Sequence, residues 1–421
     1  MTERLLQYIW QFQYFNRQDL SVSDGAALQI IHPGKYNTNQ GPDFLEASIK
    51  IDTTILVGNI ELHINSSDWK KHGHDADDNY KNVILHVVWL HDEADLPAAV
   101  PLLDLQSRVS VLLLHQYEEW MQQSSFVPCA ALVKEAGALV WMAWMERLMA
   151  ERLQHKSKYI LQLLNACNSH WEETCWQLLA RNFGMHVNAD AFENIARSLP
   201  VSILARHKNQ VIVLEALLLG QAGLLEEPFA DDYAQLLQRE YQFLRHKYNL
   251  SKPAIAVYFL RMRPAAFPSI RLAQLAMLVH QSTHFFAAIK EAVSLHEVIK
   301  LLNVTANDYW HYHYRPGIQS AYKIKKLGSA MLNNIIINTV APVLFSYGLY
   351  HKEQKLMDKA LQWLSETGAE KNSIINGWQQ LGIAPEDAYQ SQALIELKTQ
   401  YCNKKKCLDC AVGNALLKKN V

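Results

Sequence analysis

The sequence has few of the residues that mark unstructured or fibrous proteins. Its 421 residues include 16 Gly and 13 Pro, and charged residues make up 19% of the chain against 49% for hydrophobic residues. Disordered and collagen-like chains carry far more Gly, Pro or net charge than this. The composition therefore indicates a globular protein, long enough for two or three domains of about 100 to 200 residues each.

An excess of charge of one sign is also missing, as are long apolar runs. The formal net charge is -1, so any nucleic-acid binding must come from local features of the surface. No run of about 18 apolar residues occurs. The first residues, MTERLLQYIWQFQYF, lack the basic start and the cleavage site of a secretory signal. We expect a soluble, cytoplasmic protein with no membrane partner.

Cysteine is scarce. Of the six cysteines, three are crowded at Cys402, Cys407 and Cys410, which does not resemble an extracellular disulfide framework spread along the chain. Reduced thiols or a metal site are expected instead.

The pattern of apolar and turn-forming residues changes near residue 125. Before it, short runs rich in Val, Ile and Leu are separated by Gly, Asn, Asp and Pro, which is typical of strands. After it, stretches such as LVWMAWMERLMAERLQHKSKYILQLL show helical spacing. We predict an α+β protein, with an α/β domain at residues 1–125 followed by a large all-α region at residues 126–421.

The first 125 residues are expected to contain two helices and a set of strands. The helices are predicted at 3–15 and 109–122. The strands are predicted at 27–32, 44–51, 54–64, 83–90 and 101–106.

Polar residues stand on one face of the strand at 54–64. In GNIELHI, residues 58–64, strand alternation points Glu61 and His63 away from the apolar side chains between them. Asp43 precedes the strand at 44–51, and a hairpin of these two strands would bring it near Glu61. Two converging carboxylates could hold Mg²⁺ or Mn²⁺ and leave water free for hydrolysis.

Pro42-Asp43, a spacer and then Glu61-Leu62-His63 resemble the PD-(D/E)xK nuclease superfamily. The resemblance implies an α/β domain with a mixed sheet, in which Asp43 and Glu61 bind the metal. It places His63 where the family has a lysine that orients the attacking water. Histidine could accept a proton or bind the metal itself, so its role can differ. The alternative is that these are polar residues on the exposed face of an antiparallel sheet.

More histidines follow directly. His72 and His74 flank a glycine in a predicted turn or short helix, and we expect them to contact substrate. Asn39 and Gln40, in the loop before Asp43, are further candidates for substrate binding, although Asn is also a common turn residue. His86 lies in an apolar strand and is either a core residue or a ligand.

These patterns predict a metal-dependent nuclease-like protein that cleaves or binds DNA or RNA. The alternative is a non-catalytic, metal-stabilised interaction protein with a histidine-rich site. The aromatic run NDYWHYHYRPG, residues 307–317, either stacks on unpaired bases or forms a core between helices.

Several phrases along the chain resemble an uncharacterised bacterial family, domain of unknown function 2851. They are RHK (206–208), EALLLGQAGLL (215–225), RMRPAAFPSIRLAQLA (261–276), NDYWHYHYRPG (307–317) and SQALIELKTQYCNKKKCLDCAVG (391–413). The resemblance covers essentially the whole chain. It implies that both parts form one architecture, and it implies no activity.

The cysteine spacing near the C-terminus is the strongest local signal in the second part. Cys402-x4-Cys407-x2-Cys410 fits a zinc or iron–sulfur site that lacks one ligand. The fourth could be a histidine or one of the cysteines at 129, 167 and 175. The alternative is a set of partly buried, reduced thiols.

Overall fold

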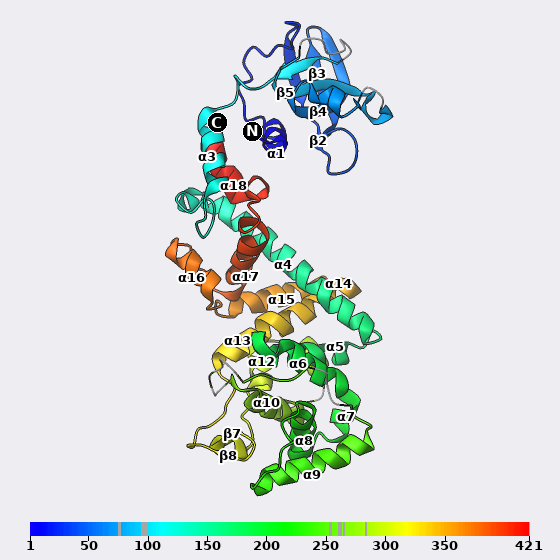
Figure 1. Ribbon diagram of the computed structural model, residues 1–421, viewed down its shortest axis with the longest axis vertical. Helices are drawn as coiled ribbons and strands as arrows, with labels where there is room; N and C mark the ends of the chain where they lie inside the picture. The colour runs from blue at the N-terminus through cyan, green and yellow to red at the C-terminus, as the bar shows by residue number, and fades with distance from the viewer. Residues whose placement is uncertain are drawn as a thin grey trace. The chain divides into compact units, whose positions relative to one another are not determined.

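The computed structural model describes residues 1–74, 77–93, 100–251, 255–259, 263, 266–282 and 284–420. It confirms an α+β protein, with 57% of residues in helices and 12% in strands. The chain forms two compact units (Figure 1). Unit 1 comprises Met1–Trp144 and Leu397–Val421, and unit 2 comprises Met145–Glu396.

This division differs from the predicted one at residue 125. The border lies within the long helix α4 (Ala138–Ala166), and the last segment of the chain returns to unit 1. Hydrophobic periodicity indicates where a helix forms. It carries no information on which distant segment the helix packs against.

Unit 1 is built around a mixed sheet in the strand order β1-β3-β4-β5-β6, with the short β2 paired to β3. The neighbours β1, β3 and β4 run antiparallel, whereas β4, β5 and β6 run parallel. The strands are β1 (Leu28–His32), β2 (Lys35–Tyr36), β3 (Phe44–Ile51), β4 (Thr54–Asn65), β5 (Val83–Leu90) and β6 (Leu102–Asp104). The helices are α1 (Glu3–Gln11), α2 (Asp68–Lys71), α3 (Val111–Gln122) and, at the C-terminus, α18 (Ala411–Leu417).

The central strand β4 shows the predicted alternation. Ile60 and Leu62 are fully buried, and α1 packs against β4. Helix α1 begins after Thr2, whose side chain accepts a hydrogen bond from the Leu5 amide. It ends at Gln11 and not at residue 15 as predicted, because Gln13 takes a positive φ of 55° that interrupts the helix.

The described residues of unit 2 are mainly helical and include one small hairpin, β7 (His313–Arg315) with β8 (Ile318–Gln319), which the prediction of an all-α region did not include. Besides the rest of α4, its first helices are α5 (Trp171–Phe183), α6 (Met185–Ser198), α7 (Val201–Arg206), α8 (Val211–Gln221), α9 (Asp232–Lys247), α10 (Pro268–Gln281), α11 (Phe285–Glu291) and α12 (Leu295–Leu302). Its last are α13 (Ser329–Ile335), α14 (Ala341–His351), α15 (Gln354–Glu366), α16 (Ser373–Gln380) and α17 (Ala388–Glu396).

A π-helical turn, Ile336–Val340, joins α13 to α14. Within the described ranges, this joined segment, Ser329–His351, is the one helix long and apolar enough to cross a membrane. In its most apolar window, 72% of the residues are buried inside the structure. That burial is what the core helix of a helical unit shows.

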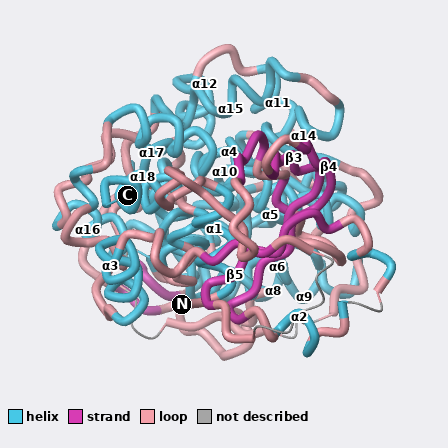
Figure 2. Tube along the Cα trace, turned by 90° about the horizontal axis from the view of Figure 1, so that it is seen from above, coloured by secondary structure: helices cyan, strands magenta, loops and turns pink. Residues whose placement is uncertain are grey.

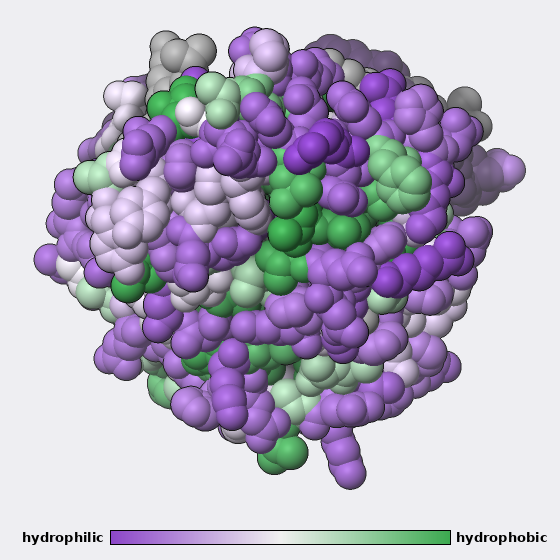
Figure 3. Space-filling model, turned by 90° about the horizontal axis from the view of Figure 1, so that it is seen from below, coloured by the Kyte–Doolittle hydropathy of each residue, from purple (hydrophilic) through white to green (hydrophobic). Residues whose placement is uncertain are grey.

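Figure 2 shows β3, β4 and β5 next to one another and helices making up much of the remaining chain. The face drawn in Figure 3 is mostly hydrophilic, and its hydrophobic side chains form separate patches.

Gly58 allows β4 to approach the segment before β5. A Cβ atom there would lie 2.5 Å from the Asn82 carbonyl oxygen and 2.6 Å from Cγ2 of Ile84. We expect Gly58→Ala to destabilise the protein by about 1–3 kcal/mol, because the strands would have to separate. Thermal unfolding measures this. Gly137→Ala is the control, since a Cβ there meets nothing within 4 Å. Equal stability of the two variants would contradict the close approach.

Candidate metal centre

Three polar side chains share one face of the parallel strands β4 and β5. Glu61 pairs with His86 across the two strands, and His63 lies two residues further along β4. All three are buried, with 5% of Glu61 and 1% of His63 exposed. The prediction that Glu61 and His63 stand together is confirmed, but they line a buried face of the sheet.

Asp43 is tied to β4 by two reciprocal hydrogen bonds. Its backbone N–H donates to Oε2 of Glu61 at 3.0 Å, and its Oδ2 accepts from the Leu62 amide at 3.1 Å. Its other oxygen, Oδ1, accepts from the side chain of Gln7 in α1 at 2.8 Å. The β3–β4 hairpin therefore brings Asp43 to Glu61, as predicted, while both oxygens of Asp43 already have protein donors.

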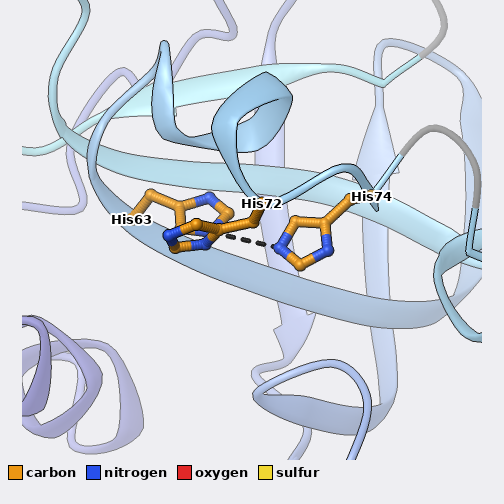
Figure 4. A group of neighbouring side chains, drawn as sticks. All are labelled: His63, His72 and His74. Carbon is orange, nitrogen blue, oxygen red and sulfur yellow. Dashed lines mark hydrogen bonds between the residues drawn. The ribbon is translucent and has the colours of Figure 1, made fainter.

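The segment after β4 adds two more histidines to the same place. It passes through α2 and a turn at Gly73, with φ of +70°, which carries His72 and His74 back over the β4 face. Figure 4 shows the rings of His63, His72 and His74 grouped together. The ring of Tyr80 stacks on His74 with centroids 3.8 Å apart.

The donor atoms of these side chains are spaced as metal ligands are. Nε2 of His63 lies 3.1 Å from Nδ1 of His72 and 3.3 Å from Nε2 of His74. Oε1 of Glu61 lies 3.6 Å from Nε2 of His63 and 3.5 Å from Nε2 of His74. Bonds of about 2.0–2.1 Å around a tetrahedral zinc ion place neighbouring donors roughly 3.3–3.4 Å apart. One ion could therefore contact His63 and His74 together with either Glu61 or His72. We call Glu61, His63, His72 and His74 the histidine centre.

His86 holds the central histidine in place. Its Nε2 lies 2.9 Å from Nδ1 of His63. For His63 to present the Nε2 lone pair to an ion, its Nδ1–H must donate to His86, and this bond then fixes both the tautomer and the ring orientation. Nε2 of His63 has a single lone pair but two imidazole neighbours, so a cation would satisfy this arrangement better than one shared proton.

The histidine centre has little positive charge of its own, because burial disfavours the charged forms of its side chains. Burial is the main cause that raises the pKa of Asp43 to about 7 and that of Glu61 to about 8, and repulsion by Asp43 adds to the shift of Glu61. Burial also lowers the pKa of His63 to about 3 and that of His86 to about 4, helped by the neighbouring imidazoles. Neutral imidazoles are in the protonation state that binds a divalent cation, and a cation bound here would displace the proton of the Glu61 carboxyl.

The donor set changes which metal is expected. The sequence suggested Mg²⁺ or Mn²⁺ held by Asp43 and Glu61. Imidazoles, with at most one carboxylate beside them, suit zinc or a similar first-row metal better than Mg²⁺, which prefers oxygen ligands.

The remaining residues predicted to contact substrate are Asn39, Gln40 and the aromatic run of unit 2. Asn39 and Gln40 are exposed in the loop between β2 and β3, where the side chain of Asn37 binds the Gln40 carbonyl at 3.3 Å. In the aromatic run of unit 2, Trp310 is fully buried and Tyr309 stacks on Tyr233 at 4.3 Å. Part of that run is therefore used in packing between aromatic rings.

The sequence did not indicate Gln7 as part of the site, and it left the role of His86 open. Gln7 gave no signal, since a glutamine in an amphipathic helix has no distinctive spacing. His86 was left between core residue and ligand. It is a buried partner of a candidate ligand, and its position directly beside Glu61 follows from a parallel register that the sequence did not reveal.

The raised pKa of Glu61 makes a prediction about stability. In chelator, the folded state keeps the Glu61 proton up to about pH 8, whereas the unfolded state loses it near the ordinary value of 4.5. Stability should therefore fall as pH rises between these values. Glu61→Gln, which needs no proton, should be more stable than the wild type at pH 8 by about 1 kcal/mol or more. Near pH 5 the two should be similar.

Thermal unfolding at both pH values in chelator measures this, and saturating Zn²⁺ should reverse the order at pH 8 because Gln is a poor ligand. A wild type more stable than Glu61→Gln at pH 8 in chelator would contradict a buried, uncompensated carboxyl.

No curated protein and no solved structure matches the chain. A family described as "Protein of unknown function (DUF2851)" matches residues 3–373. The resemblance to PD-(D/E)xK nucleases stays a prediction. The two units described here, with the histidine centre in the first, are therefore those of a chain that belongs to the DUF2851 family.

Proposed function

We propose that unit 1 is a metal-dependent, nuclease-like phosphodiesterase that acts on DNA or RNA. The observation that carries the proposal is the meeting of Glu61, His63 and His74 at 3.5–3.6 Å beside Asp43. A bound divalent ion would supply a water of lowered pKa and neutralise phosphate charge. The order Asp43, Glu61, His63 along the hairpin also supports the resemblance to PD-(D/E)xK nucleases.

The side chains take distinct parts in this proposal. Glu61, His63 and His74 hold the ion, and His72, which is exposed, lies on the side from which substrate would approach. Asp43 positions Glu61 through its backbone N–H and, with a raised pKa of about 7, could exchange a proton near neutral pH. His63 stands at the position that a lysine has in PD-(D/E)xK nucleases, but it acts as a metal ligand and not as an ammonium group.

The second candidate is a non-catalytic, metal-stabilised interaction protein. One observation favours it: Glu61 and His63 are almost completely buried, and both oxygens of Asp43 accept hydrogen bonds from the protein. Such a closed set of ligands is typical of a structural metal site.

Cleavage assays separate the two candidates. Purified protein is incubated with single- and double-stranded DNA and RNA, with Zn²⁺, Mn²⁺ or Mg²⁺ and with chelator. We expect cleavage that needs metal, and a loss of about 100-fold or more in Asp43→Asn and Glu61→Gln, which keep the side-chain shape. Glu46→Gln is the control, because that carboxylate is exposed on β3 and paired with Lys35.

His63→Lys extends the test. If the side chain at position 63 only orients water, His63→Lys should retain part of the activity. If His63 is a metal ligand, as proposed, the variant should lose the metal and the activity together. Full activity in Asp43→Asn or Glu61→Gln would overturn the nuclease proposal. Metal binding without cleavage of any of these substrates would support the second candidate.

A further inference from the structure

Four cysteines from two distant parts of the chain meet in unit 1. They are Cys129, Cys402, Cys407 and Cys410, and they are called the cysteine group. The Cys402 thiol lies within electrostatic range of the other three, and the Cys407 thiol lies within range of Cys129 and Cys410. All four are free thiols, and three of them are buried.

The two segments that carry the group are fastened together on both sides of it. The Lys398 ammonium lies 4.7 Å from the centre of the Phe126 ring. The Lys419 ammonium donates to the Glu135 carbonyl and forms an ion pair with its carboxylate, both at 3.0 Å. The meeting of Cys129 with the C-terminal cysteines therefore follows from the packing of whole segments.

The backbone around Cys407 and Cys410 is tightly constrained. Lys405 takes a positive φ of 51° between Cys402 and Cys407. Cys410 precedes α18, and its sulfur accepts hydrogen bonds from the Val412 and Gly413 amides. Only glycine fits at 413, since a Cβ there would lie 2.3 Å from the Cys407 carbonyl oxygen. Burial raises the pKa of the Cys410 thiol, and these backbone N–H groups, which favour the thiolate, offset part of that shift.

The spacing of the thiols favours a cluster over a single ion. Zn–S bonds of about 2.3 Å place sulfurs roughly 3.8 Å apart around zinc. Among the described residues, His63, His72 and His74 form the group of possible ligands whose donor atoms all lie within 4.8 Å of one another. All four thiols belong to described residues, and no three of them meet this limit. The thiols are thus more widely spaced than zinc requires. A [4Fe–4S] cluster takes one thiolate on each of its irons, which separates the sulfurs further.

We propose that the cysteine group binds one [4Fe–4S] cluster, which fastens the C-terminal segment to unit 1. This site is separate from the histidine centre, and its existence does not depend on nuclease activity. Ligation would release the thiol protons and add the binding free energy to the stability of unit 1.

The test uses the full chain, purified and reconstituted with ferrous iron, ferric iron and sulfide in the absence of oxygen. We expect about four iron atoms and four sulfides per chain, with broad visible absorbance that bleaches on reduction. Cys129→Ser should reduce the iron content to background and lower the melting temperature. Cys167→Ser is the control, because Cys167 lies in unit 2 and should leave the iron content unchanged.

A readout on the wild type covers the case in which Cys129→Ser does not fold. Alkylation followed by mass spectrometry should find the four cysteines protected together in the reconstituted protein and reactive together after chelation. One equivalent of zinc with no retained iron would overturn the cluster. No retained metal, or protection of Cys402, Cys407 and Cys410 without Cys129, would overturn the four-cysteine site.

Discussion

Two hydrogen bonds between Asp43 and β4 position everything else in the candidate site. They join the Asp43 amide to Glu61 and the Leu62 amide to Asp43 at the point where β3 enters the hairpin. Because each carboxylate binds the other strand's backbone, neither can turn away, and Oε1 of Glu61 is left facing His63 and His74. The arrangement places two carboxyls in a buried region, where their charge is costly without a cation.

The surrounding histidines do not compensate the charge of these carboxyls with positive charges of their own. A lysine or arginine beside Glu61 would form a closed ion pair. Instead, the neighbours are imidazoles, and burial lowers the pKa of His63 and His86 so that these two rings stay neutral. A neutral ring offers a lone pair and no charge, so the Glu61 carboxyl is neutralised either by its own proton or by a bound cation. This is the physical reason for interpreting the site as a metal centre and not as a buried salt bridge.

The sequence predicted the strands well and the site in part. Strands β3 and β5 have the predicted bounds, because β-branched residues and clear turn signals mark their ends. The pairing of Asp43 with Glu61 followed from the hairpin. The place of His72 and His74 did not, since a turn with Gly73 at positive φ can direct the chain to several places. The return of residues 397–421 to unit 1 was also not predictable, because no local pattern encodes contacts between segments so far apart.

X-ray absorption of the zinc-loaded protein tests the central claim, a metal bound by the histidine centre, most directly. The account predicts a first shell of nitrogen and oxygen at about 2.0–2.1 Å, with the outer-shell scattering of imidazole rings. This signal should be lost in a variant without the His63 ring. A shell of oxygen alone, or a spectrum that this substitution leaves unchanged, would contradict the account by placing the metal elsewhere.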